Sequence, residues 1–149
     1  MCIRDRGNSY RRFAIIRLAE LYLNYAEALN EAEGPTAEVY NAVNKIRRRA
    51  QLLDLPANLT KDEMRNKIRQ ERRVELAFEN HRFWDVRRWK IAEIVDNKKV
   101  HKITVNADGT YSYPVFQNRV FDKAKHYLFP IPQSEIDKNR NLVQNPGWN

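Results

Sequence analysis

One stretch of the sequence, residues 71–89, carries most of the information about the fold and reads ERRVELAFENHRFWDVRRW. Upstream of it, Met64 and Ile68 begin an apolar stripe with helical spacing. The next steps along that stripe lead to Glu71 and Glu75, so the apolar face becomes acidic. A carboxylate on an inward face is costly unless it is paired, and arginines in the same stretch can pair with it. The stretch therefore predicts a partly buried ion-pair network.

The predicted network joins two helices, one that ends near Glu79 and one that covers about residues 82–95. Guanidinium groups make planar, bidentate contacts with carboxylates, and we expect Trp84 and Trp89 to shield these contacts from water. The expected members are Glu71, Arg72, Arg73, Glu75, Arg82, Asp85, Arg87 and Arg88.

Glu71 and Glu75 also raise the question of catalysis, because they lie one helical turn apart and glycosidases use paired carboxylates. Glutamates at this spacing are common on helices, however, and the flanking arginines favour the ionised form. An ionised carboxylate cannot act as a general acid. We expect no catalytic residue and no enzymatic activity.

Two helices are predicted upstream, over residues 14–33 and 36–50. Gly34-Pro35 ends the first and Thr36 can cap the second, so a short turn makes them an antiparallel hairpin of the tetratricopeptide type. One hairpin cannot bury both of its faces, so neighbouring elements are expected. The first helix is predicted from residues that recur at three- and four-residue steps, namely Ile15, Leu18, Leu21, Tyr22, Tyr25, Ala26 and Leu29. The second is predicted to carry Val39, Tyr40, Val43, Ile46 and Arg47 on one side.

The third helix begins at a capping box, with Thr60 as N-cap and Glu63 three residues later. After Asn97 the pattern changes to a β-hairpin, in which residues 103–105 and 111–113 flank a turn at Asp108-Gly109. The tail is rich in loops, with one short helix near residues 133–138. The expected fold is mainly α, with tetratricopeptide-like helical hairpins, a small β-hairpin and a loop-rich C-terminal tail.

Composition limits the class of protein. The 149 residues are 42% hydrophobic and 31% charged, which is typical of an ordinary globular chain. The net charge of +8 lies mostly between residues 41 and 100, where arginines alternate with glutamates and apolar residues rather than forming a one-sided stripe. We therefore expect no nucleic-acid partner, although a basic nucleic-acid binder remains an alternative. No apolar run is long enough to cross a membrane as a helix.

Isolated reactive side chains point to no site. His81, His101 and His126 lack the spacing of metal ligands, so we expect no metal and no cofactor. Tyr111 and Tyr113 share a strand face that can stack on sugars, but packing of the hairpin against the helices is the favoured interpretation. Trp148 is expected to clasp the tail onto the helical body.

Four blocks in order, over residues 14–149, resemble the SusD/RagB family of surface nutrient-binding lipoproteins of Bacteroidetes. The first helix, IRLAELYLNYAEA from Ile16, is similar to that family's tetratricopeptide-like helix, and NKIRRRA from Asn44 to the second. Residues 71–89 resemble the signature helix pair. The blocks YLFPIPQSEI from Tyr127 and QNPGW from Gln144 resemble the C-terminal end.

This resemblance implies a non-catalytic protein that binds an oligosaccharide or a peptide at the cell outer membrane. It implies a SusC-like TonB-dependent transporter as partner and membrane attachment only through a lipid anchor that is missing from this chain. It transfers no ligand-binding residue, because glycan contacts in the family lie largely upstream or in variable loops. A helical-repeat adaptor that binds other proteins is the alternative.

The chain departs from the family pattern in two ways. Asn80 stands where the family usually has glycine, and since Asn tolerates a left-handed backbone, the turn should survive. Members of the family are also much longer. We expect residues 10–149 to be the C-terminal part of a SusD/RagB-like domain and residues 1–9 to be an unstructured, non-native leader, with Cys2 carrying no role.

Overall fold

A computed structural model describes residues 15–148 of the protein. The predicted leader, residues 1–9, lies outside the described residues. The described part of the chain forms two compact units, residues 15–79 and residues 80–148, which are taken separately below. Within it, no helix is both long and apolar enough to cross a membrane.

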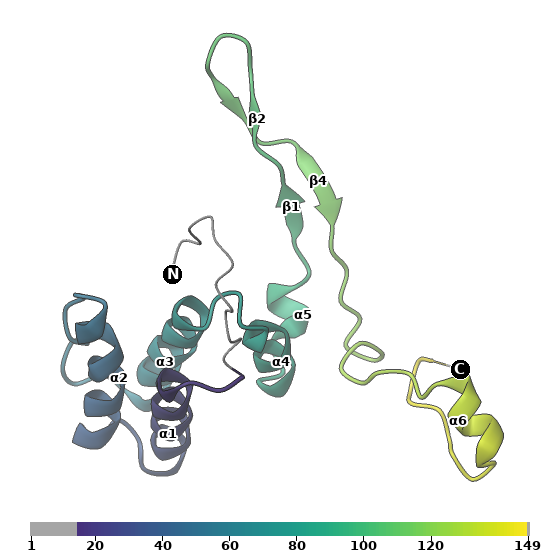
Figure 1. Ribbon diagram of the computed structural model, residues 1–149, viewed down its shortest axis with the longest axis horizontal. Helices are drawn as coiled ribbons and strands as arrows, with labels where there is room; N and C mark the ends of the chain where they lie inside the picture. The colour runs from purple at the N-terminus through teal and green to yellow at the C-terminus, as the bar shows by residue number, and fades with distance from the viewer. Residues whose placement is uncertain (1–14, 149) are drawn as a thin grey trace, which may run out of the picture. The chain divides into compact units, whose positions relative to one another are not determined.

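The first unit contains the helices α1 (Leu18–Glu33), α2 (Ala37–Arg49) and α3 (Lys61–Glu75), with α1 packed against both of the others (Figure 1). The predicted helical hairpin is confirmed. Gly34 ends α1 with a φ of 89°, in the region that favours glycine, and its N–H donates to the Asn30 carbonyl.

The two predicted N-caps differ in their hydrogen bonding. Thr60 caps α3 through a complete capping box, because its hydroxyl accepts from the Glu63 N–H and the Glu63 carboxylate accepts from the Thr60 N–H. Thr36 occupies the N-cap of α2, but its hydroxyl makes no capping hydrogen bond. The position of both caps was predicted correctly, and the bond was predicted correctly for Thr60 alone.

The core of the first unit lies between α1, α2 and α3. One cluster contains Ala26, Val39, Ala42, Val43, Leu55, Met64 and Ile68, and a smaller one contains Leu23, Ile46 and Leu76. The side of α2 that was predicted to be mainly apolar lies largely in this core, since Val39, Val43 and Ile46 are buried.

The apolar residues from which α1 was predicted do not all lie in the core. Ile15, Leu18 and Leu21 are 81%, 63% and 53% exposed, and Leu23 is buried instead. The reason is that α1 carries apolar residues on more than one side. Its neighbours α2 and α3 cover the side of Leu23 and Ala26, and periodicity alone does not choose between the sides.

The third helix is shorter than predicted, since it ends at Glu75 rather than near Glu79. Phe78 and Asn80 then adopt left-handed backbones with φ of 65° and 66°. The prediction that Asn80 would keep the left-handed turn is confirmed.

The second unit begins with α4 (His81–Arg88) and α5 (Ala92–Val95), where a single helix over 82–95 was predicted. The break is a Schellman-type end, in which Ile91 N–H donates to the Val86 carbonyl and Lys90 N–H to the Arg87 carbonyl. Lys90 accordingly has a left-handed φ of 54°.

Two antiparallel strand pairs follow one another along a single hairpin (Figure 1). The strands β2 (Thr104–Val105) and β3 (Tyr111–Ser112) form the predicted pair. The pair of β1 (Lys99–His101) with β4 (Val115–Asn118) lengthens it and was not predicted. We call residues 99–118 the arm.

The tail contains α6 (Gln133–Lys138), at the predicted place. The core of the second unit is small and consists of Val86, Ala92 and Phe121, with Tyr127 packed against it. Together the two units confirm the predicted fold class, which is mostly helical with a small β-hairpin and a loop-rich tail.

Candidate functional site

The carboxylates of α3 bind arginines of the first helical hairpin. The Glu71 Oε2 atom lies 2.8 Å from Arg47 Nη1, and both Glu75 oxygens lie 2.8 Å from Arg49 Nη2. Arg17, just before α1, donates from Nη1 to Glu75 Oε1 at 2.6 Å. The side chains of Glu71 and Glu75 are each 10% exposed, so these are partly buried ion pairs.

Arg17 ties the beginning of α1 to the end of α3. Its Nε donates to Glu79 Oε2 at 2.7 Å, and Nη2 donates to the Glu75 carbonyl. The hydrogen bond to Glu79 is the largest influence on the pKa of Arg17 and raises it. Burial acts in the opposite direction, but the hydrogen bond and charge of Glu75 also raise the pKa, so Arg17 stays charged.

Arg72 is the most deeply buried arginine of the predicted set, with a side chain that is 3% exposed. Its Nη1 donates to Asn24 Oδ1 at 2.5 Å, and its Nε lies 4.0 Å from Glu27 Oε2. Both contacts come from α1. Arg73, the next residue, is exposed.

The predicted members on α4 lie in the second unit. Asp85 is buried and binds Arg88 Nη2 at 2.9 Å through Oδ1. The Arg87 guanidinium lies 3.6 Å from the ring centre of Phe83, and Arg82 lines a pocket described below. A network that spans both helices and includes all eight expected residues stays a prediction.

Three partners were missed from the sequence, namely Arg17, Arg47 and Arg49. The position of Arg47 indicated a partner, because this arginine was predicted on the otherwise apolar side of its helix. Arg17 and Glu75 are 58 residues apart in sequence, so no local pattern links them.

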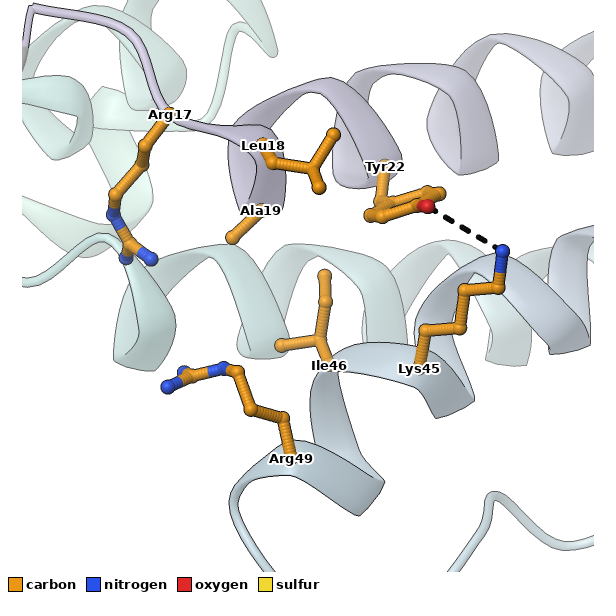
Figure 2. A pocket seen from close by; sticks show the side chains of 7 residues that line it. All are labelled: Arg17, Leu18, Ala19, Tyr22, Lys45, Ile46 and Arg49. Carbon is orange, nitrogen blue, oxygen red and sulfur yellow. Dashed lines mark hydrogen bonds between the residues drawn. The ribbon is translucent and has the colours of Figure 1, made fainter.

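A pocket of about 290 Å³ opens where α1 begins and α2 ends (Figure 2). Its apolar lining comes from Leu18, Ala19 and Ile46. Tyr22 and Lys45 lie at one end, where the ammonium group is 3.4 Å from the phenolic oxygen and 4.8 Å from the ring centre.

Arg17 and Arg49 lie at the other end of this pocket, and Glu75 binds both. Their charge is therefore largely compensated within the protein. Chemically, the hollow suits an apolar side chain better than an anion.

A second pocket, of about 480 Å³, lies within residues 80–148 beside α4 and β4. Aromatic and aliphatic side chains, including Phe83, Val86 and Phe121, line part of it. The polar lining consists of Arg82, Arg87, Asp96, Gln117, Asn118 and Arg119. Carboxylate, amide and guanidinium groups beside aromatic rings can hold a polar organic ligand.

The aromatic residues of the arm are exposed. Tyr111 and Tyr113 are 63% and 61% exposed, so the predicted packing of these rings against the helices is wrong. A two-stranded hairpin has no covering layer of its own, which leaves its side chains in solvent. Phe83, Trp84 and Phe129 form a separate cluster, with ring centres of Phe83 and Trp84 5.0 Å apart.

Trp148 fastens the tail to itself rather than to a helix. Its indole Nε1 donates to the carbonyls of Lys125 and Leu128 at 3.1 and 3.0 Å, and the Lys125 ammonium lies 4.2 Å from the ring centre. The predicted clasp onto the helical body is therefore wrong, because the indole binds the segment that precedes α6.

The histidines lie in separate places. His101 Nδ1 is 2.7 Å from the Tyr113 carbonyl, and His126 Nδ1 accepts from the Asp122 N–H at 2.9 Å. Among residues 15–148, no three His, Cys, Asp or Glu side chains gather in a way that could hold a metal ion.

The sequence and the fold are similar to those of known proteins. The model of the SusD family matches residues 3–148. SusD-like protein P2 of Formosa agariphila is 36% identical over 141 residues, which cover 89% of this chain and 25% of that protein.

Two solved structures share the fold. A crystal structure of a SusD-like protein from Bacteroides fragilis matches 91% of this chain and 26% of its own, with 38% identity and a TM-score of 0.81. Surface glycan-binding protein A from Bacteroides thetaiotaomicron, in complex with laminarihexaose, matches with 27% identity and a TM-score of 0.61, over 89% of this chain and 24% of its own.

The chain thus spans about a quarter of the length of the relatives that it matches. The family match nevertheless covers almost every residue of the chain, and it extends through the hairpin, the α3–α4 segment and the tail. This protein therefore belongs to the SusD family.

Proposed function

We propose that the protein is a non-catalytic, nutrient-binding component of an outer-membrane uptake system. The observation that carries this proposal is the match to the SusD family over residues 3–148, and the fold shared with a surface glycan-binding protein solved with laminarihexaose supports it. In this function the protein captures an oligosaccharide or a peptide at the cell surface. It is held there by a lipid anchor and passes its ligand to a SusC-like TonB-dependent transporter.

The ion pairing of the two α3 carboxylates, Glu71 and Glu75, supports a non-catalytic function. Glu71 and Glu75 each bind an arginine at 2.8 Å or less, so neither is placed to exchange a proton with a substrate. We propose that these pairs hold the helices in place, together with Arg72, and that residues 15–79 act as a rigid scaffold.

A second candidate is a helical-repeat adaptor that binds other proteins. The exposed side of α1 favours it, since Leu18, Leu21 and Tyr25 are 63%, 53% and 49% exposed. An adaptor would use this side to bind a protein partner, and it would not need a saccharide.

The test is purification of the tagged full-length gene product from outer membranes in mild detergent, followed by identification of the proteins that accompany it. A TonB-dependent barrel in near-equal amount is the expected result. Recovery from the soluble fraction, with other partners and with no saccharide or peptide bound, would contradict the uptake function and favour the adaptor.

A further inference from the structure

The pocket of residues 80–148 gathers three guanidinium groups around one hollow of about 480 Å³. They belong to Arg82, Arg87 and Arg119, and among the described residues that line the pocket only Asp96 carries a carboxylate. The lining is therefore net positive. A concave wall of one charge sign raises the local concentration of ions of the opposite sign.

Arg87 is held in place before any ligand arrives. Its guanidinium carbon lies 3.6 Å from the ring centre of Phe83 and 5.3 Å from that of Phe121, and Nη1 donates to the Phe83 carbonyl at 3.1 Å. Its Nε is buried and has no hydrogen-bond partner among the described residues. A fixed guanidinium loses little conformational entropy when it binds an anion.

Arg119 has a fixed backbone and an available side chain. Its N–H donates to the Lys98 carbonyl at 3.1 Å, which continues the pairing of β1 with β4. Its side chain is exposed, and no hydrogen bond or ion pair within residues 15–148 engages the guanidinium. The planar fork can therefore make bidentate contacts with a ligand.

The remaining polar side chains suit the hydroxyl groups of a sugar. Gln117 and Asn118, at the end of β4, offer amide donors and acceptors, and Asp96 offers a carboxylate acceptor. Phe83 contributes by supporting Arg87, whose guanidinium lies over its ring.

We propose that this pocket binds an acidic saccharide, in which a carboxylate or sulfate group meets Arg87 and Arg119 and the sugar hydroxyls meet Asp96, Gln117 and Asn118. The inference rests on the proposed function, because it names the chemical class of the nutrient. A neutral sugar would offer no anionic group for the guanidinium groups of Arg87 and Arg119 to bind.

The experiment is calorimetric titration of the full-length gene product with three probes. Oligogalacturonate supplies carboxylates, a carrageenan oligosaccharide supplies sulfates, and maltohexaose is neutral. We expect an acidic probe to bind, more weakly as salt is added, and maltohexaose to bind at least about tenfold more weakly. The acidic probe that binds identifies the anionic group.

Two variants test the place of binding. Arg119→Ala should lower the affinity for the acidic probe by about tenfold or more, because it removes a charged hydrogen-bonding group from the pocket. Arg140→Ala removes the same charge from an exposed position outside the lining, and it should change affinity by less than about twofold.

Four results would overturn the inference. Equal weakening by Arg119→Ala and Arg140→Ala would mean unspecific attraction of polyanions. A lower melting temperature of Arg119→Ala with unchanged affinity would mean that the protein's own chain fills the pocket. Tighter binding of maltohexaose would leave the uptake function intact and remove the acidic specificity. Binding of no saccharide or peptide, without a transporter in the purification, would remove the proposed function as well.

Discussion

The helical core of the first unit and the arm of the second differ in how deeply they bury large apolar side chains. In residues 15–79, Val39, Val43 and Met64 are fully buried between helices. In residues 80–148, by contrast, Phe116 of the arm is 70% exposed, and Val120, just after the arm, is 78% exposed. Both units have regular hydrogen bonding, so it is burial rather than secondary structure that separates them. Their stability should therefore respond very differently to substitution.

The buried arginine of the first unit should give the largest effect. Arg72→Ala should lower the free energy of unfolding by about 3–5 kcal/mol, because it removes a buried guanidinium that donates to Asn24 and lies beside the Glu27 carboxylate. Chemical denaturation measures this. Arg73→Ala removes the neighbouring exposed arginine and should cost less than about 0.5 kcal/mol. Equal denaturation midpoints for the two variants would show that Arg72 stabilises the fold no more than its exposed neighbour does.

Core truncation compares the two units directly. Met64→Ala should cost about 2–5 kcal/mol, since it opens a cavity among fully buried neighbours. Phe116→Ala removes a larger side chain from the arm, yet its exposure predicts a change within about 0.5 kcal/mol. A large loss of stability for Phe116→Ala would show that the arm is covered in solution, and the contrast between the units would then disappear.

The two N-caps sharpen the comparison within the first unit. Thr60→Ala should cost about 1 kcal/mol, because it removes the hydroxyl that accepts from the Glu63 N–H. Thr36→Ala changes the same residue type at the same helix position, but no capping bond is lost, so we expect less than half of that effect. Thermal melts of the two variants measure this difference. A larger loss of stability in Thr36→Ala than in Thr60→Ala would contradict the capping bonds described above.

Acid should act on the first unit through carboxylates whose pKa values are lowered. Arg65 lowers the pKa of Glu31 below its ordinary 4.5, chiefly through a hydrogen bond. A pKa that is lower in the folded state stabilises the fold above the ordinary value, and this stabilisation is lost as the pH falls through the folded pKa. We expect the free energy of unfolding to decrease from about pH 5 to about pH 3. The free energy of unfolding should depend less steeply on pH in Glu31→Gln than in Glu33→Gln. Identical pH dependence in the two variants would show that Glu31 is not the source of the acid sensitivity.

Sequence patterns predicted the features that depend on local chemistry. Gly34 ends a helix, Asn80 keeps a left-handed turn, and the capping box at Thr60 begins a helix, because in each case the deciding atoms lie within a few residues. The short helix over residues 133–138 was predicted for the same reason.

Features that depend on distant contacts were not predictable in this way. The apolar periodicity of α1 does not say which of its residues are covered, because that depends on where α2 and α3 pack. The arginines that bind Glu75 come from residues 17 and 49, far away in sequence. The break between α4 and α5 at Lys90 contains no glycine or proline from which it could have been predicted.

The turn at the tip of the arm has a practical consequence. Asn106 N–H donates to the Thr110 carbonyl, and Asp108 accepts from the Thr110 N–H and hydroxyl, so residues 106–110 close on themselves. The turn needs no support from either core, and its residues are exposed. Such tips tolerate added residues. Ala107 is therefore a suitable place for an epitope tag or a single labelling cysteine, through which the protein could be followed on living cells.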